Sequence, residues 1–265
     1  MPEMLEVEAY RGLAERAGLG RRIAAVNAPD AWYLKRGLQA PALEVLVGCQ
    51  FVAARRLGKL LLLATETGEG DAGPVLGLRS GMSGRLVIDG TAGVAELRHS
   101  SNRPLPKYER FGVVFSDGGH LAVRDPRRLG GVELDPAESH LGYDAAEVTQ
   151  AQLAQALSTS RAPLKTRIMD QGHLAGVGNL IADEVLWRAG LSPLRPASSL
   201  VPTELRRLHR HLRAALIYMG ARGGSHTGDL IPQRMPGGTC PRDGQPLRRD
   251  KVGGRTTWWC PAHQR

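Results

Sequence analysis

Cysteine is scarce in this sequence, which holds three among 265 residues: Cys49, Cys240 and Cys260. So odd and sparse a set argues against a disulfide framework and favours a reducing compartment. Hydrophobic runs are short, and a run such as residues 60–64 is far below the length that spans a bilayer. Residues 2–8 are acidic where a signal peptide would be basic. We therefore expect a cytoplasmic protein.

Aromatic side chains are also few, at 5%, whereas glycine (33) and proline (17) are plentiful, which indicates a chain rich in turns. Acidic residues are outnumbered, because 35 Lys and Arg stand against 26 Asp and Glu and give a formal net charge of +9. This excess points to a polyanionic partner, although ribosomal and membrane-surface proteins share it. The length allows two domains, or one large domain with an appendage.

The pattern of the chain changes along its length. Residues 3–17 have helical spacing, short β-like runs broken by turns follow, and helical patterns dominate over residues 145–219. Many short strands with little helix between them favour an antiparallel sandwich. We therefore expect a multidomain α+β protein: an antiparallel β-sandwich with flanking helices over residues 1–138, a helical domain over 139–222, and a short loop with a β-hairpin over 223–265. The expected strands cover residues 22–26, 44–47, 60–64, 75–78, 85–88, 111–115 and 120–124.

Residues 164–193 have the pattern of two helices around a glycine-punctuated turn. Gly176 and Gly178 would let the backbone approach a partner closely. Asn179 follows at the entrance of the second helix, where free N–H groups and a partial positive charge suit an anion. Gly190 marks the end of that helix. We infer that the partner is a phosphate backbone; a tight helix–helix turn capped by asparagine is the alternative.

The carboxy-terminal segment carries two short pairs of metal-ligating residues. Cys240 and Asp243 form one pair, Cys260 and His263 form the other, and sixteen residues lie between Asp243 and Cys260. This spacing suits two knuckles joined by a β-hairpin, and zinc accepts sulfur, nitrogen and oxygen ligands. A zinc-free hairpin held by tryptophan packing is the alternative. Basic residues suited to phosphates or a minor groove decorate the hairpin, namely Arg248, Arg249, Lys251 and Arg255.

Four further motifs accompany the glycine turn and the hairpin. They are MPEMLEVE at residues 1–8, GKL at 58–60, GMSG at 81–84 and DPRRLG at 125–130. Together and in this order, the motifs resemble those of the Fpg/Nei (formamidopyrimidine-DNA glycosylase / endonuclease VIII) family of base-excision DNA repair enzymes. The resemblance covers nearly the whole chain, and its amino terminus is of the Fpg type. It implies that the glycine turn belongs to a helix-two-turn-helix domain.

The resemblance implies a bifunctional DNA glycosylase and AP lyase. Removal of Met1 would leave Pro2 with a free secondary amine, which attacks C1′ of the damaged nucleotide, expels the base and forms a Schiff base that permits β- and δ-elimination. By the same resemblance, Glu3 donates or shuttles a proton near the sugar, Glu6 assists in the active site, and Lys59 binds phosphate at the lesion. Without the resemblance, an ordinary capped helix start would explain Pro2, Glu3 and Glu6.

The implied partner is double-stranded DNA that contains a lesion or an abasic site, bound by a monomer. The target base has to leave the stack, and a wedge has to fill the gap. From the residues alone, core filling by a methionine and a solvated basic turn remain alternatives for the wedge positions. By resemblance, the wedge residues are Met82, Arg127 and Leu129, and the phosphate clamps are Lys165, Asn179 and Arg255.

The tail resembles the family's zinc finger. This implies one structural zinc ion held by Cys240, Asp243, Cys260 and His263. The spacing matches the family's, but Asp243 and His263 stand where the family has cysteines.

Further departures from the family pattern bear on activity. Leu5 replaces a proline, Arg79 and Ser80 replace His-Leu, and the loop over residues 225–239 is short, with Gly228 where a basic residue is usual. The short loop does not predict a preference for 8-oxoguanine. These departures leave a second hypothesis open, a damaged- or branched-DNA binder that has lost turnover. A third hypothesis, an RNA-binding or ribosomal module with a zinc knuckle, does not explain the amino terminus.

Overall fold

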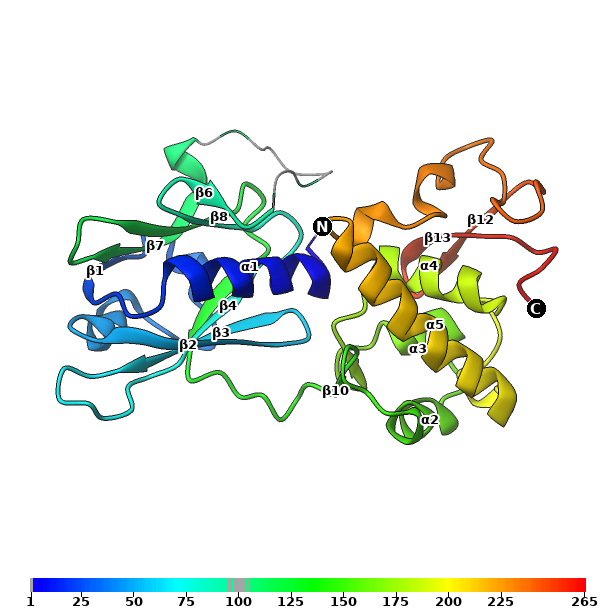
Figure 1. Cartoon of the computed structure of the whole chain (residues 1–265), viewed down its shortest axis with the longest axis horizontal. Helices are drawn as coiled ribbons and strands as arrows, with labels where there is room; N and C mark the ends of the chain where they lie inside the picture. Colours follow the sequence, from blue (N-terminus) through cyan, green and yellow to red (C-terminus); the bar gives the residue numbers. More distant parts are fainter. Residues whose placement is uncertain (1, 95–96, 98–102, 104) are drawn as a thin grey trace. The chain divides into compact units, whose positions relative to one another are not determined.

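The computed structural model describes all residues except 1, 95–96, 98–102 and 104, and it forms two compact units (Figure 1). The first unit contains Pro2 and Glu6–Glu138, and the second contains Glu3–Leu5 and Ser139–Arg265. Helix α1 (Met4–Ala17) therefore starts in the second unit and continues in the first. Within the described residues, every helix is too short or too polar to cross a membrane.

The first unit is the predicted antiparallel β-sandwich. One sheet has the strand order β2-β3-β4-β9, the other has the order β1-β7-β8-β5-β6, and all strand pairs in both are antiparallel. Its strands are β1 (Ile23–Asn27), β2 (Gln50–Leu57), β3 (Leu60–Glu66), β4 (Leu76–Arg79), β5 (Arg85–Ile88), β6 (Thr91–Ala92), β7 (Glu109–Phe115), β8 (His120–Arg124) and β9 (Gly131–Leu134), with short 3-10 helices η1 (Ala31–Tyr33), η2 (Ala40–Leu46) and η3 (Pro106–Tyr108).

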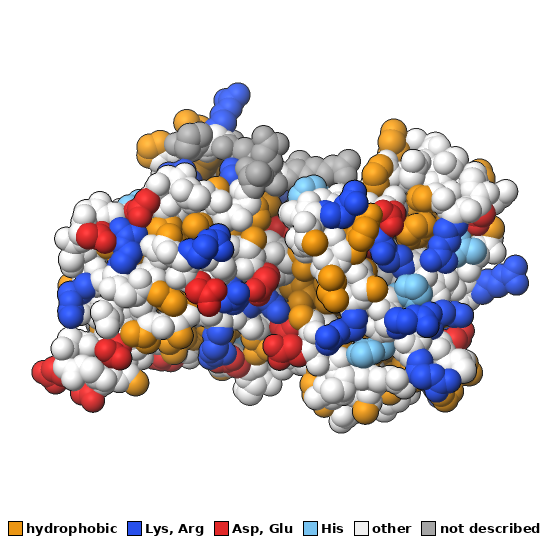
Figure 2. Space-filling model, viewed as in Figure 1, with side chains coloured by type: hydrophobic (Ala, Val, Ile, Leu, Met, Phe, Trp, Pro, Cys, Tyr) orange, Lys and Arg blue, Asp and Glu red, His pale blue; other side chains and the backbone are white. Residues whose placement is uncertain are grey.

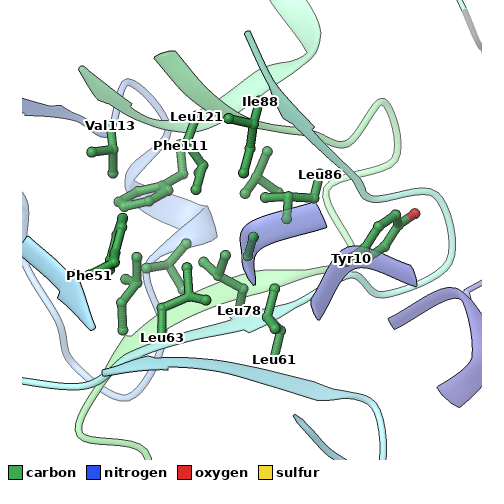
Figure 3. Packing of buried hydrophobic residues seen from close by; sticks show 14 of the residues in the cluster. Tyr10, Phe51, Leu61, Leu63, Leu78, Leu86, Ile88, Phe111, Val113 and Leu121 are labelled. Atoms are coloured by element: carbon green, nitrogen blue, oxygen red, sulfur yellow. The ribbon is translucent and has the colours of Figure 1, made fainter. Parts of the chain in front are cut away.

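Apolar side chains from the two sheets meet in one core (Figure 3). Leu86 and Ile88 of β5 point the same way because side chains alternate along a strand. Phe51 of β2 packs edge-to-face on Phe115 of β7, with ring centroids 6.1 Å apart. Tyr10 of α1 also enters this core, and its hydroxyl donates a hydrogen bond to the carbonyl of Gly84 at 2.9 Å. Helix α1 is thereby tied to the loop that contains the GMSG motif.

The strand predicted at residues 44–47 is wrong. These residues form the end of η2, which starts after Gln39 and has Pro41 in its first turn. Leu43 and Leu46 are both buried, and a spacing of three places them on the same side of a 3-10 helix. A segment of four residues is too short to distinguish the two-residue period of a strand from the three-residue period of a 3-10 helix.

The second unit consists mainly of helices. Helices α4 and α5 pack through buried residues such as Ile181 and Val185 of α4 and Leu208, Leu212 and Leu216 of α5. Gly190 ends α4 with φ 63°, the left-handed conformation expected at a helix end. The elements are β10 (Tyr143–Asp144), α2 (Gln150–Ser158), α3 (Leu164–Ile168), β11 (Leu174–Ala175), α4 (Asn179–Ala189), η4 (Ala197–Ser199), α5 (Pro202–Ala221), η5 (Ser225–Thr227), η6 (Ile231–Gln233), β12 (Arg248–Val252) and β13 (Arg255–Trp259).

The carboxy-terminal hairpin of β12 and β13 packs on α4 through a small core of its own. Trp187 of α4 and Trp258 of β13 are buried there together with Cys240 and Cys260. The hairpin turns at Gly253 and Gly254, whose φ values of 55° and 74° suit a tight two-residue turn.

Candidate active site

Glu3 lies with its carboxylate buried at the amino-terminal end of helix α4. Its Oε1 accepts a hydrogen bond from the backbone N–H of Leu180 at 2.8 Å, and its Oε2 accepts one from Ile181 at 3.1 Å. The first N–H groups of a helix have no partner within it and carry partial positive charge. Gly178, at the N-cap, has no side chain to satisfy them. Glu3 caps the helix instead, and so restricts where its neighbour Pro2 can lie.

Two glycines make room for this amino-terminal segment. A Cβ at Gly178 would overlap the carboxyl group of Glu3, and one at Gly176 would lie 2.9 Å from the sulfur of Met4. Gly176 also has φ 109°, and its carbonyl accepts a hydrogen bond from the N–H of Met4 at 3.2 Å. The chain itself therefore supplies an anion at this helix terminus, Glu3, and Glu3 and Met4 are close partners of the glycines; a phosphate contact at this turn stays a prediction.

Asn179 is the first residue of α4 and is half-buried. Its Oδ1 is buried and has no hydrogen-bond partner among the described residues. A buried acceptor without a partner costs about 1–3 kcal/mol, so such groups are often completed by a ligand or by water. The sequence placed Asn179 at a helix entrance, and the structure adds that its amide oxygen lacks an internal partner.

Lys165 is fully buried, which does not fit its predicted role as a phosphate clamp. Its Nζ lies 2.6 Å from Asp183 Oδ1 and donates a hydrogen bond to Thr257 Oγ1 at 2.8 Å. Asp183 also pairs with Arg234 at 2.9 Å and accepts a hydrogen bond from the N–H of Trp258 at 3.3 Å. This ionic network joins α3, α4 and the carboxy-terminal hairpin. Lys165 therefore helps to hold the hairpin against α3 and α4.

In the first unit, the GMSG loop (residues 81–84) lies against the DPRRLG loop (residues 125–130). Asp125 is buried between them and accepts a hydrogen bond from the hydroxyl of Ser83. The same carboxylate accepts hydrogen bonds from the N–H groups of Leu129 at 2.9 Å and Gly130 at 2.8 Å. The structure thus brings the three predicted wedge residues, Met82, Arg127 and Leu129, onto two loops that share one buried carboxylate.

The tip of the DPRRLG loop is exposed, whereas Met82 of the GMSG loop is half-buried. Leu129 is 50% exposed, which is unusual for a large apolar side chain, and Arg127 is exposed as well. Arg128 has φ 56° and binds Asp30 through two contacts of 2.6 Å. This bidentate pair lowers the pKa of the Asp30 carboxyl, with the Arg128 hydrogen bond as its largest cause. The loop is therefore anchored at Arg128 and presents Arg127 and Leu129 outward.

The remaining predicted catalytic residues also belong to the first unit. Glu6 of α1 is buried, and its charge, after burial, is the second cause that raises the pKa of Tyr10. Lys59 is half-buried at the two-residue turn between β2 and β3, where Gly58 has φ 58°. A glycine at the first position of such a turn is typical of type II′ hairpins. The turn presents Lys59 at the end of a stiff antiparallel pair.

Four ligand atoms gather where the sequence predicted a metal site. Atoms of Cys240, Asp243, Cys260 and His263 all lie within 4.8 Å of one another. His263 Nδ1 lies 3.5 Å from Cys240 Sγ and 3.4 Å from Asp243 Oδ2, and Cys260 Sγ lies 3.3 Å from the same oxygen. A tetrahedral zinc ion at its usual bond lengths of about 2.0–2.3 Å would separate such donors by about 3.5 Å. The donor set therefore fits zinc in chemistry and in size.

Neighbouring groups orient two of these ligands. His263 Nε2 lies 3.1 Å from the carbonyl oxygen of Trp187, which requires the ring proton on Nε2 and leaves Nδ1 free for a metal. The indole Nε1–H of Trp187 donates to Cys240 Sγ at 3.3 Å. Trp187 thus holds one ligand through its backbone and another through its side chain.

Several buried polar residues that organise these sites were not predicted from the sequence. Asp125 and Ser83 join the two loops, and Asp183 joins α4 to the hairpin. Glu184 is also fully buried and accepts hydrogen bonds from the N–H groups of Asp229 at 3.0 Å and Leu230 at 2.9 Å. The signal that could have found two of them was the placement of adjacent acids, Asp183 and Glu184, inside an otherwise apolar helix.

Two family models match this chain. The formamidopyrimidine-DNA glycosylase N-terminal domain matches residues 1–132, and the formamidopyrimidine-DNA glycosylase H2TH domain matches residues 141–228. The formamidopyrimidine-DNA glycosylases of Paracoccus denitrificans and Thermus thermophilus are each 33% identical to it. Those alignments cover 100% of this chain and 100% and 98% of the two relatives.

Solved structures agree on the fold. A complex of Lactococcus lactis Fpg with DNA containing an abasic site is 23% identical, with a TM-score of 0.81 and full coverage of both chains. A complex of the same species' Fpg with DNA containing Fapy-dG is 24% identical, with a TM-score of 0.82 and 99% of this chain covered. Fold and sequence together define a DNA glycosylase with a helix-two-turn-helix domain. The chain belongs to the formamidopyrimidine-DNA glycosylase family, within the Fpg/Nei group that its motifs predicted.

Proposed function

We propose that this DNA glycosylase is bifunctional: it removes a damaged base and then cleaves the strand as an AP lyase, through a Schiff base on Pro2. One observation carries the proposal. The carboxylate of Glu3, covalently next to Pro2, is buried and held by two backbone N–H groups at the start of α4. An amino terminus tied down in this way meets the need of a terminal nucleophile for a defined position.

The bonds change in a fixed order. Once Met1 is removed, the Pro2 nitrogen attacks C1′, the C1′–base bond breaks, and the base leaves with that electron pair and a proton. The sugar ring then opens as the C1′–O4′ bond breaks, which leaves an iminium on the proline. Loss of the C2′ proton breaks the C3′–O3′ bond, and a second elimination breaks the bond to the 5′ oxygen. An α-amino group has a pKa of about 8, so a useful fraction of the amine is neutral near pH 7.

Glu3 and Glu6 are the acid–base residues of this proposal. We assign proton transfer at the sugar to Glu3, whose carboxylate is held in a fixed position next to Pro2 by two hydrogen bonds. Glu6 is buried one turn into α1 and assists by shaping the charge around the amino terminus. Lys59 supplies a cation for the phosphate next to the lesion.

The DNA grip divides between backbone contacts and a wedge. Asn179, whose side-chain amide N–H groups can donate to phosphate oxygens, and Arg255, exposed at the start of β13, supply contacts to the phosphate backbone. Met82, Arg127 and Leu129 fill the gap left by the extruded nucleotide, with Leu129 as an exposed apolar wedge. Lys165 is left out of this grip because it is buried against Asp183. Bacterial proteins are among the relatives, so we place the action on nucleoid DNA in the cytoplasm.

The metal centre has a structural part in this proposal. Cys240, Asp243, Cys260 and His263 would hold one zinc ion, and the ion would supply only the cross-link that keeps the hairpin folded. The protein's own residues then present Arg255 to DNA. No chemical step of the reaction takes place at the metal site. The hairpin contacts DNA through its basic side chains.

Borohydride trapping tests the proposal. Protein shown by mass spectrometry to lack Met1 is mixed with duplexes carrying an abasic site or one of a panel of oxidised bases, and the covalent adduct is quantified. We expect an adduct with the abasic duplex and with at least one lesion, and a loss of at least 100-fold in Pro2→Gly.

The same experiment separates the second hypothesis. If abasic DNA is bound tightly while adduct formation is absent, and Pro2→Gly binds equally well, the protein is a damaged-DNA binder without turnover. Glu15→Gln is the matched control, because Glu15 is an exposed carboxylate on the same helix α1. It should leave the adduct yield unchanged.

A further inference from the structure

Helix α5 carries a strongly basic outer face that the proposed lesion site does not use. Its inner face is apolar and packs on α4 through residues such as Leu208 and Leu212. Its outer face exposes arginines at three- and four-residue spacing, and blue side chains gather over α5 in the second unit (Figure 2). We call this the α5 basic surface; it consists of Arg206, Arg207, Arg210 and Arg213 of α5 with Arg188 and Arg242 beside them.

Most of these charges have no carboxylate to balance them. Within the described ranges, Arg206, Arg210, Arg213 and Arg242 form no ion pair, and Arg207 reaches its single carboxylate at 3.9 Å. Arg188 is the exception, with contacts of 2.7 Å to both Glu184 and Asp229. A solvated helix face usually alternates its charges in pairs. An unbalanced row of guanidinium groups instead creates a positive field able to attract a polyanion.

Several of these guanidinium groups are held in place by the protein. Arg242 lies over the ring of Trp187 at 5.2 Å and donates to the carbonyl of Arg188 at 3.0 Å. Arg213 donates to the carbonyl of Ala146 at 2.8 Å. Side chains already ordered lose less entropy when they bind a ligand. The surface is therefore partly organised before any partner arrives.

The charges converge on one histidine. The pKa of His211 is lowered from its ordinary value, first by burial and then by Arg210, Arg242, Arg188 and Arg207 in that order. The His211 ring therefore lies near guanidinium groups from α4, α5 and the loop that follows η6. Arg188, Arg207, Arg210 and Arg242 therefore lie close together around His211. Arg206 and Arg213 are each within about one helical turn of Arg210 on α5.

This surface is separate from the part of the second unit assigned to the lesion. The amino-terminal segment lies near the end of α5, since a Cβ on Gly220 would meet Leu5 at 3.6 Å. Arg210 is ten residues earlier, which is about 15 Å along the helix axis. Arg206 and Arg210 also lie on the side of α5 opposite the leucines that pack on α4. Arg188 lies in the last turn of α4, whereas Glu3 is held at the first turn.

We propose that the α5 basic surface binds the phosphate backbone of a second segment of duplex DNA. Arg206 and Arg210 are about 6 Å apart along the helix, which suits successive phosphates of one strand. One guanidinium group can bind two oxygens of a phosphate at once, and every basic residue of this surface is an arginine. Two aromatic rings lie beside the surface, and guanidinium groups cover both: Arg242 covers Trp187, which is 5% exposed, and Arg188 and Arg222 cover Tyr218. Bases therefore have little ring surface to stack on. Backbone contacts to a duplex are thus favoured over single strands.

With this surface the enzyme would have two duplex-binding sites. The first of them, the lesion site, rests on the proposed function. With one duplex held at the lesion site, the second surface would let the protein pass between DNA segments during its search, as proteins that bind by phosphate charge do. A two-colour capture experiment tests this. A biotinylated undamaged duplex on beads and a fluorescent duplex of another sequence are mixed with protein, and the captured fluorescence measures bridging.

The variant is the triple charge reversal Arg206→Glu, Arg210→Glu and Arg213→Glu, and the matched control is the triple change of the same residues to lysine. Thermal unfolding confirms that both are folded. We expect wild type and the lysine control to bridge, and the glutamate variant to bridge at least 10-fold less. Its borohydride adduct with a short abasic duplex, which fills one site, should stay within about 2-fold of wild type.

The outcomes separate the two proposals. Bridging that is unchanged in the glutamate variant, or absent from wild type, overturns the second-duplex surface whether or not the adduct forms. Bridging that depends on the arginines while no adduct forms would sustain the surface and remove the lyase. Competition by polyglutamate at concentrations where single-stranded and duplex DNA fail would identify an acidic protein as the partner and overturn the DNA assignment.

Discussion

Some residues of this protein are important because their small size leaves room for a neighbouring group, and others because of the groups they carry. Gly178 is not in a left-handed conformation, since its φ is −118°. Its importance is steric, because the carboxyl group of Glu3 occupies the position of the missing Cβ. The cap of α4 and the location of the amino terminus therefore depend on the same missing methyl group.

Gly178→Ala is predicted to lower both stability and activity. The added Cβ has to displace Glu3 from the helix terminus, which costs about 1–3 kcal/mol in the free energy of unfolding. Urea denaturation measures this cost, and borohydride trapping measures the activity. Gly220→Ala is the control: its Cβ makes an ordinary contact with Leu5 at 3.6 Å, and it should stabilise α5 by about 0.5–1 kcal/mol. Equal stability of the two variants would contradict the steric explanation.

The pair of Asp30 and Arg128 predicts a pH-dependent contribution to stability. The folded protein holds the pKa of Asp30 below its ordinary value, chiefly through the Arg128 hydrogen bond. A lowered carboxyl pKa adds stability that is fully present above the unfolded pKa, about 3.9, and is lost as the pH falls through the folded pKa. Wild type should therefore exceed Arg128→Met in stability at pH 6, and the difference should shrink below pH 4. Urea titrations at several pH values measure it; a constant difference would contradict the assignment.

At the scale of elements, the two wedge loops behave as one structure because Asp125 serves both. Ser83→Ala removes one hydrogen bond to that carboxylate and is predicted to cost about 1 kcal/mol. Asp125→Asn also disturbs the N–H contacts of Leu129 and Gly130 and should cost about 2–3 kcal/mol. Chemical denaturation tests both values.

Ser80→Ala is the matched control for these variants. Ser80 precedes the same loop and is half-buried, and it should change stability by less than about 0.5 kcal/mol. If Asp125→Asn unfolds at the same urea concentration as the control, the shared carboxylate does not hold the loops together.

The hairpin is predicted to depend on its metal. Cys260→Ser removes one of the ligand atoms and should lower the zinc content of purified protein from about one ion per chain to well below half. Trp258 and Trp259 lie in the hairpin, so their fluorescence should report its loosening. Cys49→Ser is the control, because Cys49 is buried in the first unit, outside the ligand cluster. Full zinc content in Cys260→Ser would contradict the ligand assignment.

Elements with a clear period could be predicted from the sequence, and elements without one could not. The helical pattern expected over residues 145–219 includes α5, where the leucine spacing and the Gly223–Gly224 break leave little choice. The strand at residues 85–88 has the predicted bounds. Strand β2 was missed because its charged residues, including Arg55 and Arg56, hide the alternation. The 3-10 helix η2 was mistaken for a strand because four residues do not define a period.

At the scale of the whole molecule, motif order was enough to predict the family, while side-chain burial was not readable from sequence. The cluster of four possible metal ligands was predicted because its two pairs have a short, regular spacing, and the two loops were identified from their motifs; their role as wedges stays a prediction. The burial of Lys165 was not predicted, because a lysine is usually exposed and only the fold brings Asp183, eighteen residues later, against it. The partner of Gly178 was likewise missed, because Glu3 lies 175 residues away in the sequence.

The net charge of the protein predicts a steep dependence of DNA binding on salt. If several Lys and Arg residues neutralise phosphates, affinity for an abasic duplex should fall about 10³-fold or more between 50 and 200 mM salt. Arg255→Gln should flatten the slope of log affinity against log salt by about one. Fluorescence anisotropy measures both, and a response that hardly changes with salt would contradict the phosphate contacts.

The identity of the nucleophile is tested most directly by locating the covalent bond. After borohydride reduction with an abasic duplex and digestion by nuclease and trypsin, mass spectrometry should find the sugar remnant on the peptide of residues 2–11, attached to the Pro2 nitrogen. Trypsin releases this peptide because Arg11 is the first basic residue. Protein that keeps Met1 should give no such adduct. A remnant on Lys59 or another lysine, with peptide 2–11 unmodified, would contradict the assignment of Pro2.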